Sequence, residues 1–421
     1  MLLSYFTEQP MSTYPQDEAL RIHGDDHPAR KPGDTVLLFS NRFFDPVEGS
    51  RLYRARLEHY RVAEQVGFDA VMTNEHHTAP FSMQARCNIT SAFAAAVTER
   101  VKILQLGNPL PLWDNPVQLA EETAMIDMLS GGRLIAGIVR GGGTEQLANN
   151  ANPAFNRERF QEAHDLMIKA WTVPGPWRWE GVHYDFRVVN PWAVPLQKPH
   201  PRIFVPGVIS KETVEWAARH AYPYVALGTA IEDTLKIWQF YDQVSAEAGY
   251  EAGPEHRGYL MRCCVAETEA DALRHARQYL WMAGEFTGVA RPTWANPTGY
   301  SSWESRRSRE LSGGGSLGGY KGEEDFKKHL ERGTIIAGTP DHVKARIFEW
   351  LERTRPGIMI LWASDGRMTQ EESLASIRLM GTEVLPALRK KGDELGLRSP
   401  FEANAPVSLA VGPSPKPASV S

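Results

Sequence analysis

The sequence predicts an α/β protein of the (β/α)8 TIM barrel class. Eight short apolar segments suited to buried strands recur along the chain, a segment with helical periodicity follows each of them, and no change of composition divides the chain. A doubly wound sheet could also hold eight such units, but the even alternation favours one closed barrel. The strands are expected at residues 2–6, 68–73, 101–106, 134–139, 202–205, 222–227, 259–266 and 357–362.

Helices are expected between these strands, and several carry sequence signals at their ends. The helix that starts near Arg51 closes on Gly67, a residue type favoured just after a helix. Pro116 opens another helix at a position where a missing N–H costs nothing. Ser210 takes the N-cap position of a third. The helix that begins at Pro116 is expected at 116–129, and the one that begins at Lys211 is expected at 211–220. The remaining helices are expected at 88–98, 157–171, 231–248, 270–283, 338–353 and 369–389.

The alternation is interrupted at two places late in the chain. Residues 284–322 combine Gly, Ser, Pro, Trp and Arg without period, and loops of that length are usually functional lids or disordered. We therefore expect a lid insertion after the seventh strand, within a single barrel domain of residues 1–390. Residues 391–421 are expected to form a C-terminal extension that is mostly disordered, because the tail from about Glu402 is rich in Ala, Pro, Ser and Val.

The composition argues against several classes of function. A net charge of −5, with acidic and basic residues interspersed, gives no electrostatic footprint for nucleic acid or for an anionic membrane. The first ten residues lack the basic region of a signal peptide, and no apolar run approaches the roughly 20 residues that cross a bilayer. The three cysteines form neither a disulfide framework nor a metal-ligand pattern. A cytoplasmic protein is expected.

Polar residues and glycines follow several of the strands, and in a barrel all of these strand ends meet at one mouth. Arg140 and three glycines follow the fourth strand. Glycine N–H groups and a forked guanidinium suit a phosphate. Ser210, at the positive end of a helix, offers a second place for an anion. Each feature alone is common in ordinary turns and caps, but two of them on neighbouring strands favour one phosphorylated cofactor.

Glu75-His76-His77 follows the second strand and raises the question of a metal site. Successive residues of a strand point to opposite faces, so His76 and His77 cannot both enter one site while the strand continues. No other cluster completes a ligand set, and a metal is not expected. One histidine is expected to face the mouth as an acid or base, and the other to pack against a neighbouring element or subunit. Two purely structural histidines remain the alternative.

The sequence contains no GxGxxG after a strand, no Walker A motif and no Gly-x-Ser-x-Gly elbow. A cofactor is therefore expected to carry the reaction.

Six stretches, in order and at compatible spacing, resemble the bacterial luciferase-like family of flavin-dependent monooxygenases. They reach from the first residues to about residue 390 and so cover the whole predicted barrel. The stretches are Phe6-Thr7-Glu8 with Gln9-Pro10, Gly67-Phe68-Asp69 with Glu75-His76-His77, Pro116 through Arg133, Gly137 through Gly141, Ser210 with Thr213 through Ala218, and Gly338-Thr339-Pro340.

The resemblance implies a two-component monooxygenase that binds FMN at the barrel mouth. Reduced FMN would come from a separate flavin reductase, react with O2 to give a flavin hydroperoxide, and oxygenate a small apolar or aromatic substrate. Aromatic loop residues are expected to form apolar walls around that substrate: Trp113, Trp192, Trp294, Trp303 and Trp362.

The resemblance also assigns roles by position. His76 corresponds to the active-site histidine of the family, and Ser210 and Thr213 join Arg140 as phosphate contacts. Leu106-Gly107 corresponds to a strand end near the flavin ring, where relatives have a non-prolyl cis peptide. The cofactor-binding residues implied are Leu106, Gly107, Val139, Arg140, Gly207, Val208, Ile209, Ser210 and Thr213.

Some positions bear on assembly, and others depart from the family pattern. His77 and Glu121 match positions where two subunits meet, which implies a homodimer. Val139 stands where relatives have a reactive cysteine, and Ile209 replaces a polar residue of the phosphate loop.

Two other functions share these features. One is an F420-dependent oxidoreductase, which uses the same barrel for hydride transfer without O2. The other is a non-catalytic flavin-binding protein, in which His76 would be dispensable. The Glu-His-His stretch and the phosphate pattern favour FMN.

Overall fold

The computed structural model describes residues 1–15, 40–78, 80, 82–208, 210–281, 299–303 and 322–402. Parallel strands close into the expected barrel, because the last strand pairs with the first: Leu2 aligns with Ile358. Around the barrel the strands are β1 (Leu2–Phe6), β2 (Ala70–Thr73), β3 (Lys102–Gln105), β5 (Leu134–Val139), β8 (Arg202–Gly207), β9 (Tyr224–Leu227), β10 (Arg257–Val265) and β12 (Ile358–Trp362).

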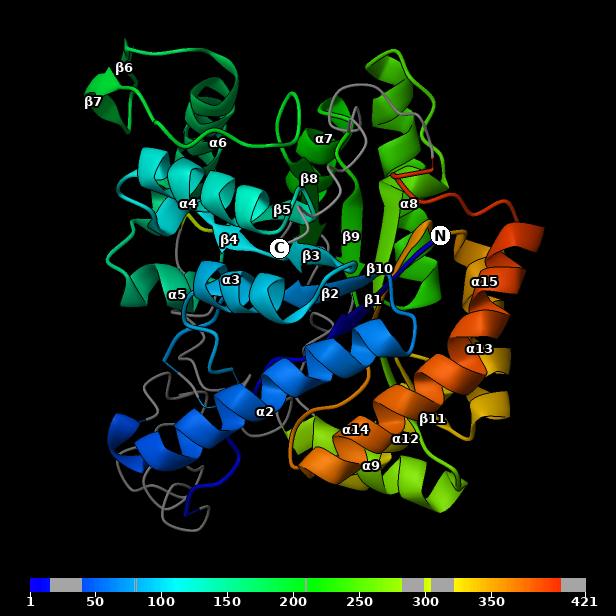
Figure 1. Cartoon of the computed structure of the whole chain (residues 1–421). Coiled ribbons are helices and arrows are strands. Elements are labelled where there is room, and N and C mark those ends of the chain that lie inside the picture. Colours follow the sequence, from blue (N-terminus) through cyan, green and yellow to red (C-terminus); the bar gives the residue numbers. More distant parts are fainter. Residues whose placement is uncertain are drawn as a thin grey trace, which may run out of the picture.

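Helices surround the strands, as Figure 1 shows. The first of them starts at Pro46, earlier than expected, because the Asp45 carboxylate accepts hydrogen bonds from the N–H groups of Val47 and Glu48. The helices that match the sequence expectations are α2 (Pro46–Gln65), α3 (Cys87–Val97), α4 (Pro116–Leu129), α6 (Asn156–Thr172), α7 (Lys211–Arg219), α8 (Ile231–Glu247), α9 (Glu269–Trp281), α13 (Pro340–Thr354), α14 (Gln370–Leu379) and α15 (Leu385–Glu394).

Alternation along the strands divides the core between the barrel interior and the helical layer. Phe6 belongs to the same apolar cluster as Met72 and Leu104 of the next strands. Its neighbour Tyr5 belongs to a second cluster, together with Tyr60 of α2. Because successive side chains of a strand point to opposite faces, each strand contributes to both layers. Polar residues also follow several strands directly at their ends, where the site described below is formed.

Four elements were not predicted. The strand β11 (Ile335–Gly338) pairs with residues 262–265 of β10, beyond the part of β10 that pairs with β9. The strand has only four residues and lies directly before the predicted helix at 338–353, so the sequence pattern does not indicate a separate strand. The others are α12 (Gly322–Glu331), a two-residue strand β4 (Asn108–Pro109) beside the end of β5, and α5 (Gly143–Ala148). The hairpin expected within 177–201 is present as β6 (Trp177–Glu180) and β7 (Asp185–Val189).

The helix α15 continues across the expected boundary at residue 390 and ends at Glu394. Residues 395–402 then return to the end of the barrel where the strands start. Phe401 lies against Lys102 and Arg202, the first residues of β3 and β8, and Glu402 accepts a hydrogen bond from the amino group of Met1. The expected disorder of 403–421, and most of the expected lid at 284–322, lie outside the described residues.

None of the helices in the described ranges is both long and apolar enough to cross a membrane.

Candidate functional site

The strands β3 and β5 approach each other closely at the mouth of the barrel. A Cβ atom at Gly137 would collide with the backbone carbonyl of Gln105, and one at Gly107 would lie 2.5 Å from the carbonyl oxygen of Gly137. The peptide bond between Leu106 and Gly107 is cis, as the resemblance implies. Leu106 is buried, while Val139, at the end of β5, is half-buried and faces the opening. Only glycine fits this crossing of backbones.

Arg140, directly after β5, connects several elements at one side of the mouth. One guanidinium nitrogen donates hydrogen bonds to Asn156 Oδ1 (3.0 Å) and to the carbonyl oxygen of Tyr300 (3.1 Å). The other donates to Ser210 Oγ (3.3 Å), so two predicted phosphate contacts lie together although they come from different strands. Tyr300 belongs to the predicted insertion, and its ring also lies under the Arg140 guanidinium. The described part of the insertion therefore reaches this end of the mouth.

Ser210 takes the N-cap position of α7, but its side chain does not cap the helix. Its hydroxyl donates instead to Glu212 (3.0 Å). One turn later, the buried Thr213 Oγ1 has no hydrogen-bond partner within the described part of the chain. The buried hydroxyl of Tyr224 likewise has no hydrogen-bond partner in the described part of the chain. Gly207 lies so close to this hydroxyl that a Cβ atom at residue 207 would collide with it. Val208 is half-buried beside Gly207, and Ile209 lies outside the described residues.

Buried hydroxyls without partners are costly unless a ligand satisfies them. A second cation stands near them that the sequence did not single out: Arg157, in the first turn of α6. Burial lowers its pKa, and the charge of Arg140 lowers it further, while Glu212, with Oε2 3.6 Å from the guanidinium, raises it. Two guanidinium groups, Ser210 and two hydroxyls in need of partners fit a phosphate group. We call Arg140, Arg157, Ser210, Thr213 and Tyr224 the phosphate end.

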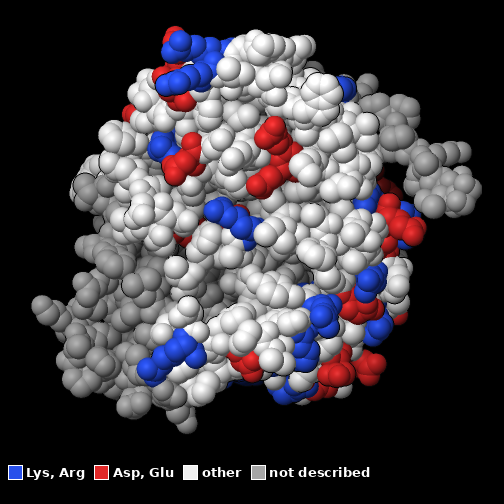
Figure 2. Space-filling view, turned by 60° about the vertical axis from the view of Figure 1, so that its left-hand side comes forward, with Lys and Arg blue, Asp and Glu red and all other residues white. Residues whose placement is uncertain are grey.

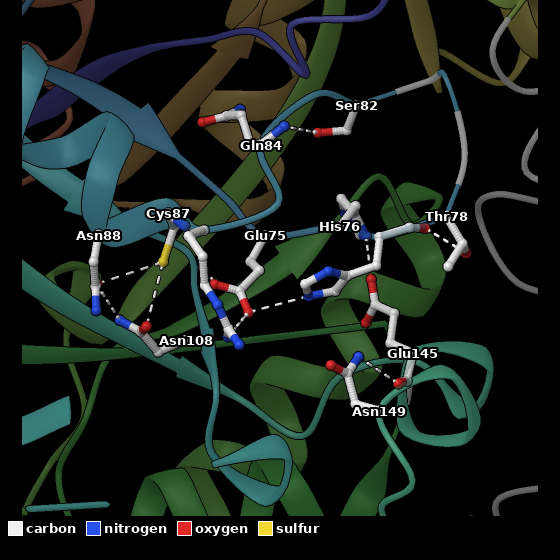
Figure 3. A network of polar contacts seen from close by, with 12 residues as sticks. Glu75, His76, Thr78, Ser82, Gln84, Cys87, Asn88, Asn108, Glu145 and Asn149 are labelled. Carbon is white, nitrogen blue, oxygen red and sulfur yellow. Dashed lines mark hydrogen bonds and ion pairs between the residues drawn. The ribbon is translucent and has the colours of Figure 1, made fainter. Parts of the chain in front are cut away.

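His76 lies on another part of the mouth, between carboxylates from two elements. Its Nδ1 is 2.5 Å from Glu145 Oε1, and its Nε2 is 3.8 Å from Glu8 Oε1. Glu8 follows β1, and Glu145 lies in α5, the helix that begins at the three glycines after Arg140. Figure 3 shows Glu145 next to His76, and the carboxylate of Glu75 on the side of Cys87, whose N–H donates to it. We call His76, Glu8 and Glu145 the histidine end.

The carboxylates set the protonation of His76. Burial opposes a charge on the ring, but Glu145 and Glu8 outweigh it and raise the pKa of His76 to about 9. Burial raises the pKa of Glu8 to about 7, with smaller contributions from Asp365 and Glu145 and against the opposing effects of His76 and Asn74. The Glu145 carboxylate loses solvation too, yet its pairing with His76 holds its pKa below the ordinary value. Near neutral pH the site therefore holds an imidazolium beside an ionised Glu145.

His76 and His77 have different partners, but both line one cavity, so the expectation that only one of them enters the mouth is not met. The strand β2 ends at Thr73, so His76 and His77 lie in a loop where alternation no longer applies. His77 Nε2 lies 3.2 Å from the carboxylate of Glu75, which also accepts hydrogen bonds from Arg86 and from the first N–H of α3. Among the described residues no group of histidines, cysteines and carboxylates could hold a metal ion.

A buried acid connects the histidine end to the far end of the chain. Asp365, after β12, accepts hydrogen bonds from Thr7 Oγ1 (2.6 Å), from the backbone N–H of Glu8 (2.6 Å) and from Trp362 Nε1 (2.5 Å). Burial raises its pKa to about 6, and Arg56 opposes the rise. The Glu8 carboxylate accepts a hydrogen bond from Asn74 (2.5 Å). Glu8 is therefore held in place through both its backbone and its side chain.

A cavity of about 270 Å³ opens beside the histidine end. Its walls come from the loop and helix at 40–53 and from the loop at 76–85. The tryptophans expected to form such walls are elsewhere. Trp113 packs half-buried against the core, and Trp362 is buried in it. Trp192 and Trp303 are 94% and 75% exposed, and Trp294 lies outside the described residues. The apolar lining is Met11, Tyr14, Phe43, Phe44, Tyr53, Pro80 and Met83.

Fold and site together define a class of proteins: a TIM barrel with a cluster of guanidinium groups and buried hydroxyls at one side of its mouth and a protonated histidine at the other. The family follows from the sequence. A model of the luciferase-like monooxygenase family matches residues 35–355, and the chain belongs to that family.

Relatives in this family include proteins that act on quite different molecules. The chain is 28% identical over 174 residues to the oxygenase component of the flavin-dependent trigonelline monooxygenase of Acinetobacter baylyi, a match that spans 41% of this chain and about half (48%) of that relative. It is 25% identical over 348 residues to the FMNH2-dependent dimethylsulfone monooxygenase of Pseudomonas putida, covering 79% of this chain and 87% of that one.

Solved structures share the fold. The monooxygenase RslO1 from Streptomyces bottropensis superposes with a TM-score of 0.66 at 25% identity, over 80% of this chain and 94% of that one. The oxygenating constituent of 3,6-diketocamphane monooxygenase from Pseudomonas putida, in complex with FMN, gives 0.63 at 18% identity, over 84% and 98%. An F420-dependent secondary alcohol dehydrogenase gives 0.60 at 17% identity, over 80% and 95%. The barrel thus occurs with both cofactors.

Proposed function

We propose that this protein is the oxygenase component of a two-component, FMN-dependent monooxygenase. The observation that carries the proposal is the pairing of the phosphate end with the histidine end across one barrel mouth. FMN has one terminal phosphate, which matches the single cluster of Arg140, Arg157 and Ser210. The FMNH2-dependent and FMN-bound relatives support the same cofactor.

The phosphate end supplies most of the anchoring. Arg140 and Arg157 provide charge-assisted hydrogen bonds, and Thr213 and Tyr224 provide hydroxyls that lack partners in the described chain. Gly107 and Gly137 allow the close crossing of β3 and β5 at the strand end where the flavin ring is expected. When bound in its reduced form, FMN supplies the chemistry that activates O2.

His76 acts as a proton donor toward the bound cofactor. With a pKa of about 9 the ring is protonated at neutral pH, and Glu145 occupies Nδ1, so Nε2 holds the proton that can be transferred. A third of the His76 side chain is exposed (34%), so the ring can be reached by a bound molecule.

The substrate is a small apolar or aromatic molecule that binds in the cavity beside His76. The cavity walls carry aromatic rings and methionine side chains, which adapt to apolar ligands. A substrate there lies next to the group that donates the proton.

Two partners complete the proposal. A separate flavin reductase supplies reduced FMN, as the designation of a relative as an oxygenase component suggests. A second copy of the chain covers exposed apolar residues of the adjacent helices α3 and α4, where Ile89 is 61%, Phe93 56% and Leu129 70% exposed. Figure 2 shows broad stretches without charge on the side that carries these helices. Sedimentation of the wild type and of Phe93→Glu tests this dimer.

The decisive experiment is an anaerobic titration with reduced FMN, followed by mixing with O2 while flavin absorbance and oxygen uptake are recorded. Binding followed by O2-dependent reoxidation through a distinct spectral species supports a monooxygenase. Binding of reduced F420 with hydride transfer to a carbonyl, and no reaction with O2, would show the deazaflavin function instead. Flavin binding without either reaction would show that the protein is a non-catalytic flavin-binding protein.

A further inference from the structure

Glu145 and Glu8 both face His76, but they do so in different ways. Glu145 Oε1 lies within hydrogen-bond distance of Nδ1 (2.5 Å), whereas Glu8 Oε1 is 3.8 Å from Nε2. Glu145 therefore fixes one ring nitrogen and with it the orientation of the ring. The other nitrogen lies on the side of Glu8. Figure 3 shows the Glu145 carboxylate beside the His76 ring.

Glu145 is itself held firmly. Its side chain is only 9% exposed, and its second oxygen accepts a hydrogen bond from the backbone N–H of Gly142 (2.7 Å). The next residue, Gln146, donates to the carbonyl oxygen of Arg140 (2.9 Å). Glu145 is thus anchored to the loop that follows β5, and its carboxylate can turn away from His76 only if α5 moves.

The charges around His76 are unequal in effect. Burial disfavours the imidazolium, and Glu145, Glu8 and Glu75 favour it, in that order. Glu75 also binds His77 and Arg86, so part of its charge is already balanced. Glu8 has a pKa of about 7 and is only partly ionised near neutral pH. Glu145 is the one of these carboxylates that is both ionised and hydrogen-bonded to the ring.

We propose that Glu145 is a positioning residue, which keeps His76 protonated and oriented so that Nε2 donates the proton. This inference rests on the role of His76 in the proposed function. The N–H bond at Nε2 breaks and its proton passes to the bound cofactor, while the neutral ring keeps its hydrogen at Nδ1 toward Glu145. Water at the exposed edge of the ring then returns a proton to Nε2, so the acid is restored without any change in oxidation state.

The test is an NMR titration of the labelled histidine rings in the protein without cofactor, comparing wild type with Glu145→Gln. The amide keeps the size of the side chain and can still accept from Gly142, but it carries no charge. The pKa of His76 is expected to fall from about 9 to about 6.5 or lower. In the loaded enzyme, the loss of product formation should then begin at lower pH, with an about 30-fold decrease at pH 8 from the smaller imidazolium fraction and little change in FMN affinity.

Three variants make the result specific. Glu8→Gln removes the more distant carboxylate and should lower the pKa of His76 less than Glu145→Gln does. Glu145→Asp restores the charge and should recover part of the shift. Glu64→Gln removes a carboxylate that also accepts backbone N–H bonds, those of residues 99 to 101, but lies in α2 away from the mouth, and should leave the pKa of His76 unchanged.

An unchanged pKa of His76 in Glu145→Gln would overturn the inference, and so would a larger fall in Glu8→Gln. Because these titrations need no cofactor, they are independent of the oxygenase assay. A protein that shows the expected shifts but never consumes O2 would refute the proposed function and leave the positioning of His76 intact.

Discussion

The two ends of the mouth are built on opposite electrostatic principles. At the phosphate end, guanidinium groups converge, and two buried hydroxyls lack partners in the described chain. At the histidine end the ring is surrounded by carboxylates and its hydrogen bonds are largely satisfied within the protein. The first end needs a ligand to be complete, whereas the second is already complete. Under the proposed function, cofactor binding and proton transfer depend on separate side chains, and substitutions should separate them.

The largest effect is expected for His76→Ala. Product yield should fall about 10²-fold or more, the usual scale for a lost acid or base group, with O2 consumption diverted to hydrogen peroxide. The dissociation constant of FMN should hardly change, because the phosphate end is intact. Parallel measurement of coupled product, peroxide and FMN binding checks this, and a large loss of FMN affinity would show that the two ends are not separate.

The converse change is Arg140→Ala, which should weaken FMN binding. Loss of the charge-assisted contacts should cost about 1.5 to 3 kcal/mol, against about 1 kcal/mol for Ser210→Ala, which removes one neutral hydroxyl. Riboflavin, which has no phosphate, should bind both variants and the wild type alike. Fluorescence titration with the two flavins is the measurement. If Arg140→Ala bound FMN as tightly as the wild type, the phosphate end would be misplaced.

The buried acids of the histidine end should make stability depend on pH. The pKa values of Glu8 and Asp365 are raised by burial to about 7 and about 6, so the folded state keeps protons that the unfolded chain releases above about pH 4. The contribution of these two acids to the free energy of unfolding should therefore fall as pH rises from about 4 to 7. Urea unfolding of wild type and Glu8→Gln across this range checks the sign, since the variant should show a weaker fall.

The smallest effect is expected for His77→Ala. Its ring loses a hydrogen bond to Glu75, worth about 1 kcal/mol, while Arg86 still pairs with that carboxylate. Subunit association or thermal stability should decrease slightly and turnover should not. Should His77 carry turnover and His76 carry assembly, the assignment of the two histidines is reversed.

The sequence predicted the parts of this protein that depend on local pattern. The eight barrel strands, the hairpin at 177–201 and the placement of Arg140 and Ser210 at strand or helix ends follow from apolar runs, turn residues and caps. Barrel closure then brings those ends together, as the hydrogen bond between Arg140 and Ser210 confirms. The cis peptide before Gly107 came from the family resemblance instead, and no local pattern of residues would have indicated it.

The parts that the sequence did not predict depend on contacts between distant elements. Glu145 lies in a short helix that follows three glycines, and it is 69 residues away in sequence from His76, which it contacts. Asp365 and Glu8 are 357 residues apart. Arg157 became a site residue only because α6 starts beside Arg140. A carboxylate in the first turn of a helix has an ordinary local explanation, so nothing in its surroundings marks it as a partner of a distant histidine.

The close crossing of Gly107 and Gly137 has a consequence for how this protein can evolve. Any side chain at Gly137 would push apart the two strands that carry the cofactor site, so this part of the barrel tolerates almost no variation. The cavity walls, by contrast, come from Phe43, Phe44, Tyr53 and Met83, which belong to loops and a helix outside the barrel strands. Under the proposed function, mutations there would reshape the substrate pocket and leave the proposed cofactor site unchanged.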